Sequence, residues 1–151
     1  MIVYDGPGDI FQYRGDAVTC PVNSVGVMGN GLALAFRNNV EGLFDFFSER
    51  YPKTSDEQLA SRRAGFLHLF EGHNPKVLLF PTKVFFYRES ILPLIDHNLG
   101  VLARFHREMN INSVALPHLG CGKGGLDYMS QVKPLIYKHF QEHPLSVSIL
   151  G

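Results

Sequence analysis

Short apolar runs alternate with amphipathic helical patterns along the whole chain. The runs are rich in β-branched and aromatic residues, which favour strands, and the alternation predicts an α/β fold with helices layered on a largely parallel sheet. The expected strands span residues 2–4, 10–13, 17–22, 66–70, 76–80, 113–117 and 146–150. In sheets of this kind, ligands bind at the carboxyl ends of the strands.

Four segments have helical patterns, namely residues 31–40, 43–50, 91–109 and 128–140. In the third, apolar residues recur at steps of three and four, which predicts a buried face. These residues are Ile91, Ile95, Leu99, Leu102, Phe105 and Met109. Ser90 is expected to cap this helix, Pro93 is tolerated in its first turn, and Asp127 or Ser130 is expected to cap the last helix. The polar residues 52–63 are expected to form a solvated connection.

The length and composition of the chain limit the kinds of protein that it can be. The chain has 151 residues, 45% of them hydrophobic, which suits a single domain over residues 1–151. Lys plus Arg and Asp plus Glu number 14 each, so there is no basic field for nonspecific nucleic-acid binding. No segment resembles a signal peptide or a membrane span, and two cysteines, Cys20 and Cys121, suit a reducing compartment. We therefore expect a monomeric cytoplasmic protein with no membrane partner.

Two glycine-rich segments each follow an expected buried strand and lead into an expected helix. The first, residues 23–33, reads NSVGVMGNGLA, and the second, residues 118–125, reads HLGCGKGG. Glycines let successive backbone N–H groups close on an anion at a helix N-terminus. One such loop could be only a turn, but two at the carboxyl ends of strands in one sheet can face each other and hold a diphosphate.

Two common phosphate motifs fit poorly. Gly120, Gly122 and Gly125 match the glycine spacing of a dinucleotide fingerprint, but no further strand–helix–strand unit follows them. A P-loop is excluded because Lys123 is followed by glycine rather than by serine or threonine.

The chain resembles the macrodomain family, within the branch that includes the DarG antitoxin and the terminal ADP-ribose protein glycohydrolase. Four motifs in order carry the resemblance, namely GDIF at residues 8–11, VNSVGVMGNGLA at 22–33, FPTK at 80–83 and ALPHLGCGKGGLDY at 115–128. The resemblance implies a three-layer α/β/α sandwich with a mixed central sheet, and ADP-ribose as the ligand.

The resemblance also implies roles by position. Asp9 and the backbone of Ile10 would read the adenine, and Asn23 would orient the distal ribose. The other implied ligand contacts are Val27, Met28, Gly29, Asn30, Gly31, Leu32, Pro81, Thr82, His118, Leu119, Gly120, Cys121, Gly122, Lys123 and Gly124. From the residues alone, Asp9 could instead cap a turn and Asn23 could stabilise one.

Lys83 is the implied catalytic residue. In this branch a lysine at this position lies near the anomeric carbon of the distal ribose and is proposed to attack it, forming a transient adduct. An amine can attack only when it is neutral, so its pKa must be lowered from the usual value of about 10.4. A solvated surface lysine is the ordinary alternative.

The chain departs from the family pattern at two positions. Cys20 replaces the first asparagine of an Asn-x-x-Asn element and is expected to be a small buried hydrophobe. Gly124 replaces the late-loop aspartate that partners the lysine in the protein glycohydrolase, so proton transfer must involve another group. His139 and His143 have helical spacing, but two ligands do not make a zinc site, and we expect neither a metal nor a cofactor.

An aromatic run follows Lys83, with Phe85, Phe86 and Tyr87 preceding Arg88. These rings could stack on an extruded base, although core packing of one or two of them is the simpler expectation. We expect an ADP-ribosyl glycohydrolase that removes ADP-ribose from thymidine in DNA or from protein and has an ADP-ribosyltransferase toxin as its counterpart. A non-catalytic ADP-ribose reader and a phosphatase acting on ADP-ribose 1″-phosphate are the alternatives.

Overall fold

The computed structural model describes residues 1–151, and all of its strands join one six-stranded sheet. The strands are β1 (Ile2–Gly6), β2 (Ala17–Asn23), β3 (His68–Phe70), β4 (Lys76–Lys83), β5 (Ser113–Leu116) and β6 (Ser146–Leu150). Their order in the sheet is β1-β6-β5-β2-β4-β3, and every pair is parallel except β3 with β4. The expected mixed sheet is therefore confirmed.

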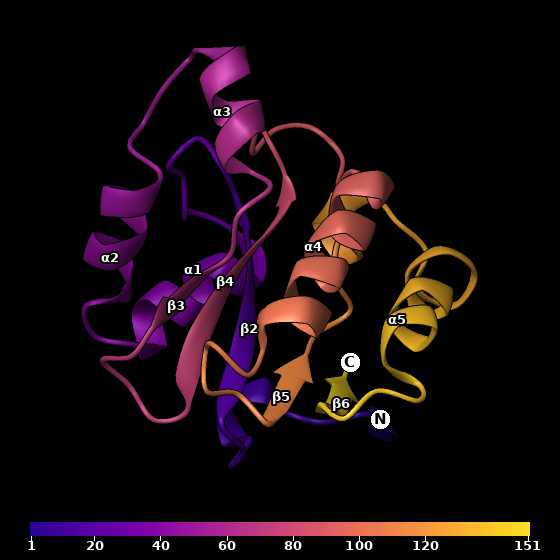
Figure 1. Ribbon diagram of the computed structural model, residues 1–151. Helices are drawn as coiled ribbons and strands as arrows, with labels where there is room; N and C mark the ends of the chain where they lie inside the picture. The colour runs from indigo at the N-terminus through magenta and orange to yellow at the C-terminus, as the bar shows by residue number, and fades with distance from the viewer.

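Helices cover both faces of this sheet (Figure 1). They are α1 (Gly31–Asn39), α2 (Leu43–Arg50), α3 (Glu57–Arg63), α4 (Leu92–Phe105) and α5 (Lys133–Phe140). On one face, Phe36 of α1 and Phe47 of α2 pack with Cys20 in one buried cluster. On the other, Leu99 of α4 and Phe140 of α5 belong to a second cluster. Burial of one stripe of each helix against an apolar sheet gives the three-layer α/β/α sandwich that the sequence implied.

The strand expected at residues 10–13 is wrong. Ile10–Gln12 form a short 3-10 turn, and Asp9 caps it because its Oδ1 accepts a hydrogen bond from the Phe11 N–H at 2.9 Å. Ile10 is buried, so its apolar character reflects packing against the core rather than strand pairing. The hydrogen bond from the Phe11 N–H to the Asp9 side chain thus stabilises a turn here in place of an extended strand.

Residues 52–63 were expected to form a solvated connection. That prediction is wrong for the second half of the segment, which forms α3. Asp56 caps this helix by accepting from the Leu59 N–H at 3.2 Å. The helix supports the first glycine-rich loop through Ser24, whose Oγ donates to the Ala60 carbonyl at 2.7 Å. The Arg63 Nε in turn donates to the Ser24 carbonyl at 2.8 Å. The polar residues of this segment therefore serve as a cap and as anchors.

Helix α4 is shorter than the apolar pattern predicted. Ile95, Leu99 and Leu102 are fully buried, whereas Ile91 is 39% and Phe105 is 44% exposed. Pro93 lies in the first turn as expected. The expected cap is wrong, because Ile91 stands at the cap position and no side chain caps the helix. The Ser90 hydroxyl therefore makes no capping hydrogen bond to α4.

The last helical segment divides into two parts. Tyr128–Val132 form a wide π-helical turn, and α5 follows directly. The expected cap is confirmed, since Asp127 Oδ2 accepts from the Ser130 N–H at 2.8 Å. Pro134 has no N–H to donate to the preceding turn, which accounts for the change of helical pitch next to it.

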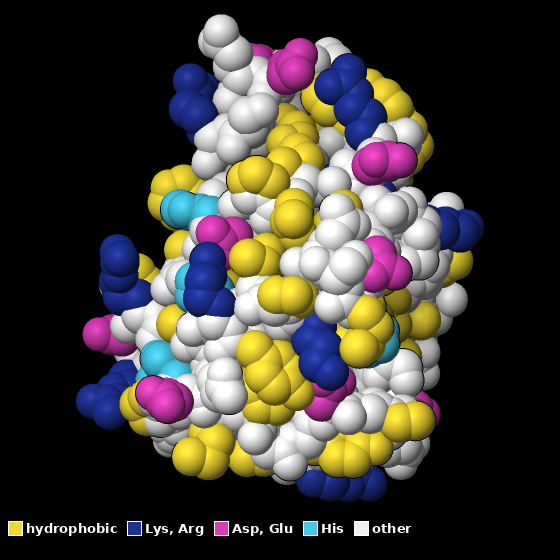
Figure 2. Space-filling view, turned by 90° about the vertical axis from the view of Figure 1, so that its right-hand side faces the viewer, with side chains coloured by type: hydrophobic (Ala, Val, Ile, Leu, Met, Phe, Trp, Pro, Cys, Tyr) yellow, Lys and Arg dark blue, Asp and Glu magenta, His cyan; other side chains and the backbone are white.

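Basic and acidic side chains are interspersed on the face that Figure 2 shows, so this face has no large patch of positive or negative charge. This distribution agrees with a net charge of zero. None of the helices combines the length and the apolar character needed to cross a membrane.

Candidate functional site

A cavity of about 610 Å³ opens at the carboxyl ends of the central parallel strands. Its lining includes Asn23 at the end of β2, Lys83 at the end of β4, His118 after β5 and Leu150 at the end of β6. This volume lies within the range of small-molecule sites, about 300–1,000 Å³. The cavity therefore stands where a parallel sheet ordinarily binds its ligand.

Most of the residues that the sequence singled out meet in this cavity. They are Asn23, Val27, Gly29, Asn30, Gly31, Leu32, Thr82, Lys83, His118, Gly120, Cys121, Gly122, Lys123 and Gly124. Five others do not line it, namely Asp9, Ile10, Met28, Pro81 and Leu119. Of these, Met28 and Leu119 place their side chains in the core, so they can reach a ligand only through the backbone.

Eight residues of the lining were not among the ligand contacts that the resemblance implied. They are Pro21, Val22, Ala33, Phe86, Ser90, Pro117, Leu150 and Gly151. Pro21, Val22, Ala33 and Pro117 flank predicted residues, so a wider window around each motif could have found them. Leu150 and Gly151 carry no local signal, since only the sheet topology brings them to the cavity.

Asn23 and Lys83 stand opposite each other on neighbouring parallel strands. The Asn23 amide holds the first loop, because its Oδ1 accepts from the Val25 and Val27 N–H groups at 3.1 and 3.3 Å. Its Nδ2 donates to the Val27 carbonyl at 2.6 Å. One N–H of this amide remains for a ligand.

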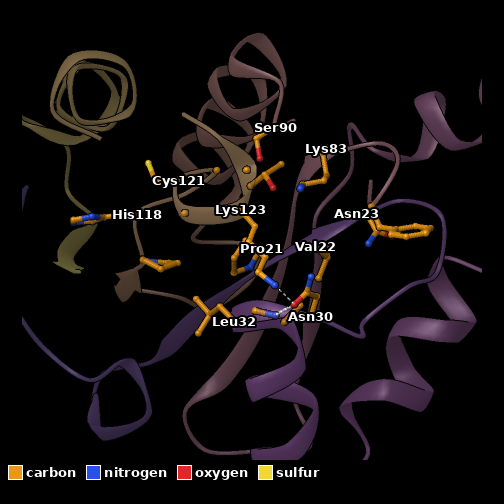
Figure 3. A pocket seen from close by; sticks show the side chains of 18 of the residues that line it. Pro21, Val22, Asn23, Asn30, Leu32, Lys83, Ser90, His118, Cys121 and Lys123 are labelled. Atoms are coloured by element: carbon orange, nitrogen blue, oxygen red, sulfur yellow. Dashed lines mark hydrogen bonds between the residues drawn. The ribbon is translucent and has the colours of Figure 1, made fainter. Parts of the chain in front are cut away.

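Lys83 is half-buried, and its side chain points into the cavity (Figure 3). Burial lowers the pKa of its ammonium group, and no neighbouring charge opposes that shift. None of the ion pairs of the protein involves Lys83. At a given pH, the neutral form of the Lys83 amine is therefore more populated than that of an ordinary surface lysine.

The first loop passes close to other backbone segments. Gly26 has φ +83°, and a Cβ at this position would lie 2.5 Å from the Tyr51 carbonyl oxygen and 2.9 Å from the Lys53 nitrogen. The neighbouring Ser24 N–H donates to the Val84 carbonyl at 3.1 Å, just beyond Lys83. These contacts fix the loop against the end of β4.

The second loop lies over Ser90. The Ser90 N–H donates to the Gly124 carbonyl at 2.8 Å, and a Cβ at Gly124 would lie 2.3 Å from Ser90 Oγ. With the hydroxyl in this position there is no room for a side chain at position 124. Gly124, which stands where the protein glycohydrolase has an aspartate, therefore leaves room for the Ser90 hydroxyl.

A single side-chain bond joins the two loops across the cavity. The Lys123 Nζ donates to Asn30 Oδ1 at 2.5 Å, and the same oxygen accepts from the Gly31 N–H at the start of α1 (Figure 3). The ammonium group therefore stands beside the N-terminus of a helix that lines the cavity. Both features favour a bound anion.

His118 forms the wall at the other side and is held by stacking. Its ring lies on Tyr128 with centroids 3.6 Å apart and planes 3° from parallel. The Tyr128 hydroxyl donates to Asp5 Oδ1 at 3.0 Å, and the Tyr137 hydroxyl donates to Asp5 Oδ2 at 2.9 Å. Burial lowers the pKa of His118, while the charge of Asp5 opposes that shift.

The aromatic run after Lys83 is not core. Phe86 is 53% and Tyr87 is 64% exposed, and Phe86 lines the cavity. Their rings meet edge to face with centroids 5.2 Å apart. The Arg88 guanidinium lies 5.7 Å from the centre of the Tyr87 ring. The expectation that one or two of these rings pack into the core is wrong for Phe86 and Tyr87.

Neither cysteine has a lowered thiol pKa, and His139 and His143 do not share a site. Cys20 is fully buried, as expected, and burial raises the pKa of its thiol. Burial and the charge of Asp127 likewise raise the pKa of the Cys121 thiol. His139 Nε2 lies 2.7 Å from Asp96 Oδ1, and His143 Nε2 lies 2.9 Å from the Ala103 carbonyl. The two histidines thus have separate partners.

Comparison with known proteins gives both sequence relatives and structural neighbours. A DNA ADP-ribosyl glycohydrolase of Mycobacterium tuberculosis is 37% identical over 145 residues, which cover 95% of this chain and 40% of that relative. The chain thus spans less than half the length of this relative. Thermosipho africanus DarTG in complex with ADP-ribose has a TM-score of 0.78 at 29% identity, covering 94% of this chain and 40% of that one. No family model matches the chain.

One solved structure corresponds to the chain over nearly its full length. The macrodomain of Mycobacterium tuberculosis DarG has a TM-score of 0.83 at 32% identity and covers 99% of this chain, which in turn covers 97% of it. The order of motifs, the sandwich and the cavity between the glycine-rich loops agree with this match. The chain belongs to the macrodomain family, in its DarG branch.

Proposed function

We propose that this protein is an ADP-ribosyl glycohydrolase, which binds an ADP-ribose modification and cleaves the glycosidic bond at its distal ribose. The observation that carries the proposal is the position of Lys83, a half-buried lysine with a lowered pKa that points into the cavity opposite Asn23. Relatives named as DNA ADP-ribosyl glycohydrolases and a neighbour solved with ADP-ribose support it.

The diphosphate lies between the two glycine-rich loops in this proposal. The first backbone N–H groups of α1 have no partner within the helix and stand at the cavity wall with Gly31 and Leu32. Lys123 adds a positive charge from the opposite loop. Fixed donors of this kind bind an anion without reorganising.

The two ends of the ligand lie on opposite sides of the diphosphate. The distal ribose meets Asn23 and Lys83, while the adenine extends toward Leu150 and Gly151. Gly8 packs against Leu150, since a Cβ there would lie 2.8 Å from Leu150 Cδ2. Asp9 follows directly, and its Oδ2 remains available to the adenine amino group while Oδ1 caps the turn.

Lys83 acts as the nucleophile. Its neutral Nζ forms a bond to the anomeric carbon while the bond from that carbon to the leaving group breaks, and the leaving group takes up the proton that the nitrogen then loses. Water next adds its hydroxyl to the anomeric carbon and gives its proton to the departing amine, which releases ADP-ribose and restores neutral Lys83. Asn23 holds the ribose for this attack, and its place across from Lys83 supplies the orientation.

We favour a nucleobase in DNA as the leaving group. The exposed Phe86 ring at the cavity lining and the adjacent Tyr87 ring offer surfaces on which an unpaired base can stack. Arg88 beside them can contact a phosphate of the same strand. An ADP-ribosylated protein is the alternative substrate, for which these rings have no evident purpose.

Single-turnover release of ADP-ribose tests the proposal. Wild type and Lys83→Ala are each incubated in excess with ADP-ribosylated thymidine in single-stranded DNA and with an ADP-ribosylated protein. We expect wild type to release ADP-ribose from DNA and Lys83→Ala to release none. Equal release by both variants would exclude the lysine mechanism. Binding without release by wild type would indicate a reader, and phosphate release from ADP-ribose 1″-phosphate alone would indicate a phosphatase.

The unpaired cysteines and the proposed activity together suggest where the protein acts and what supplies its substrate. We place the protein in the cytoplasm, since both cysteines are unpaired. We further propose that it is a monomer with one macrodomain over residues 1–151. Its substrate must be made by an ADP-ribosyltransferase, which we expect to be a toxin whose modification this protein reverses.

A further inference from the structure

Ser90 is a buried polar residue of the cavity lining, and its hydroxyl has neither a hydrogen-bond partner nor access to solvent. Only 7% of its surface is exposed, and no hydrogen bond reaches its Oγ. An unpaired buried hydroxyl costs about 1–3 kcal/mol. In native proteins such groups are few, and each calls for a physical reason.

Capping of α4 does not supply that reason. Ser90 precedes the helix, but Ile91 occupies the cap position and no side chain accepts from the first turn. Alanine would serve the fold equally well at this position, because the Ser90 contact with the second loop runs through its backbone N–H.

The surroundings of Ser90 point to a ligand instead. Ser90 lines the cavity beneath the second loop, and Figure 3 shows its hydroxyl on the same side of the cavity as the Lys83 side chain. Glycines stand above it, since a Cβ at Gly120 would lie 2.9 Å from Ser90 Cβ and one at Gly124 would lie 2.3 Å from Oγ. Neither glycine therefore places a side chain between the Ser90 hydroxyl and the cavity.

We propose that Ser90 is a further substrate-binding residue, whose hydroxyl donates a hydrogen bond to a diphosphate oxygen of ADP-ribose. The assignment to the diphosphate follows from its contacts, because Ser90 is bonded to the loop that faces Asn30 and the N-terminus of α1. Rotation about one side-chain bond, or a small shift of Gly124, brings the hydroxyl to the ligand. The inference rests on the proposed function, since it deepens the description of the same site.

The chain contains a matched control for this residue. Thr19 also carries a buried hydroxyl without a partner, but it lies within β2 and does not line the cavity. Ser90→Ala and Thr19→Val each remove one unpaired hydroxyl with little change of shape. Only the first should affect the ligand.

Calorimetric titration with ADP-ribose and with ADP, together with thermal unfolding, tests the assignment. We expect Ser90→Ala to weaken the binding of both ligands about tenfold, as for a hydrogen bond to a charged group, while its unfolding temperature is unchanged or higher. Thr19→Val should bind both ligands like wild type.

The outcomes separate the two proposals. If wild type does not bind ADP-ribose, the proposed function fails and this inference fails with it. If wild type binds and Ser90→Ala binds equally well, the inference alone is overturned. Weaker binding of ADP-ribose with unchanged binding of ADP would overturn the assignment to the diphosphate, and weaker binding accompanied by a lower unfolding temperature would indicate a structural role.

Discussion

Asn23 and Lys83 lie side by side on neighbouring strands because the register between β2 and β4 shifts at the ends of the two strands. Val22 pairs with Pro81, but the next residue of β2, Asn23, pairs with Lys83 rather than with Thr82. The additional residue in β4 places the lysine opposite the asparagine. A register shift of this kind redirects side chains at the end of a sheet, where active sites often lie.

The pH dependence of release follows from the pKa of Lys83. In the proposed mechanism only the neutral amine attacks, and burial lowers the pKa of Lys83 below its ordinary value. We expect the single-turnover rate to rise by about tenfold per pH unit below that pKa and to level off above it. The measurement is release of ADP-ribose from modified DNA across a series of buffers. Lys83→Arg keeps a cation that does not lose its proton, so it should be inactive throughout. A wild-type rate that does not vary with pH would contradict the prediction.

Gly26→Ala should destabilise the fold. The substitution forces a side chain into the left-handed region, at φ +83°, and against backbone atoms of Tyr51 and Lys53. We expect a loss of about 2 kcal/mol or more in the free energy of unfolding, measured by urea denaturation. Gly29→Ala is the matched variant, since a Cβ there meets nothing within 4 Å. Similar losses for the two variants would refute this account of the loop.

Lys123→Ala should weaken ADP-ribose binding in a salt-dependent manner. The substitution removes the bond to Asn30 and a positive charge beside the position proposed for the diphosphate. Because Lys123 is exposed, we expect a rise in the dissociation constant of about fivefold at low ionic strength, and a smaller one at about 1 M salt. Lys138→Ala is the control, since this exposed lysine pairs with Asp96 outside the cavity lining. An effect that is equal at both salt concentrations would argue against an electrostatic role.

Phe86→Ala should separate DNA processing from ligand binding. If the ring stacks on the modified base, its removal slows release from modified DNA by about 5- to 100-fold. Affinity for free ADP-ribose, which has no such base at its distal end, should change little. Phe66→Ala removes another exposed ring, which does not line the cavity, and should affect neither measurement. Release from modified DNA by Phe86→Ala at the wild-type rate would contradict base stacking on Phe86.

Local patterns predicted the parts of this protein in which chemistry and periodicity lie in one stretch of chain. The alternation of elements predicted an α/β fold, and the resemblance carried by the two glycine-rich loops and the Phe80-Pro81-Thr82-Lys83 motif implied the three-layer sandwich and most of the cavity lining. Errors arose where a single polar residue decided the conformation. Asp9 turned an apolar run into a 3-10 turn, and Asp56 began a helix in a polar segment.

The sequence by itself predicted a ligand site at one edge of a parallel sheet, because two glycine-rich loops and a lysine follow strands that must end there. Only the tertiary structure decided which side chains meet there. The register shift placed Lys83 opposite Asn23, the helix α3 anchored Ser24, and the glycines of the second loop left Ser90 without a partner. These outcomes depend on hydrogen bonds and close contacts between residues far apart in the chain, which periodicity along the chain does not encode.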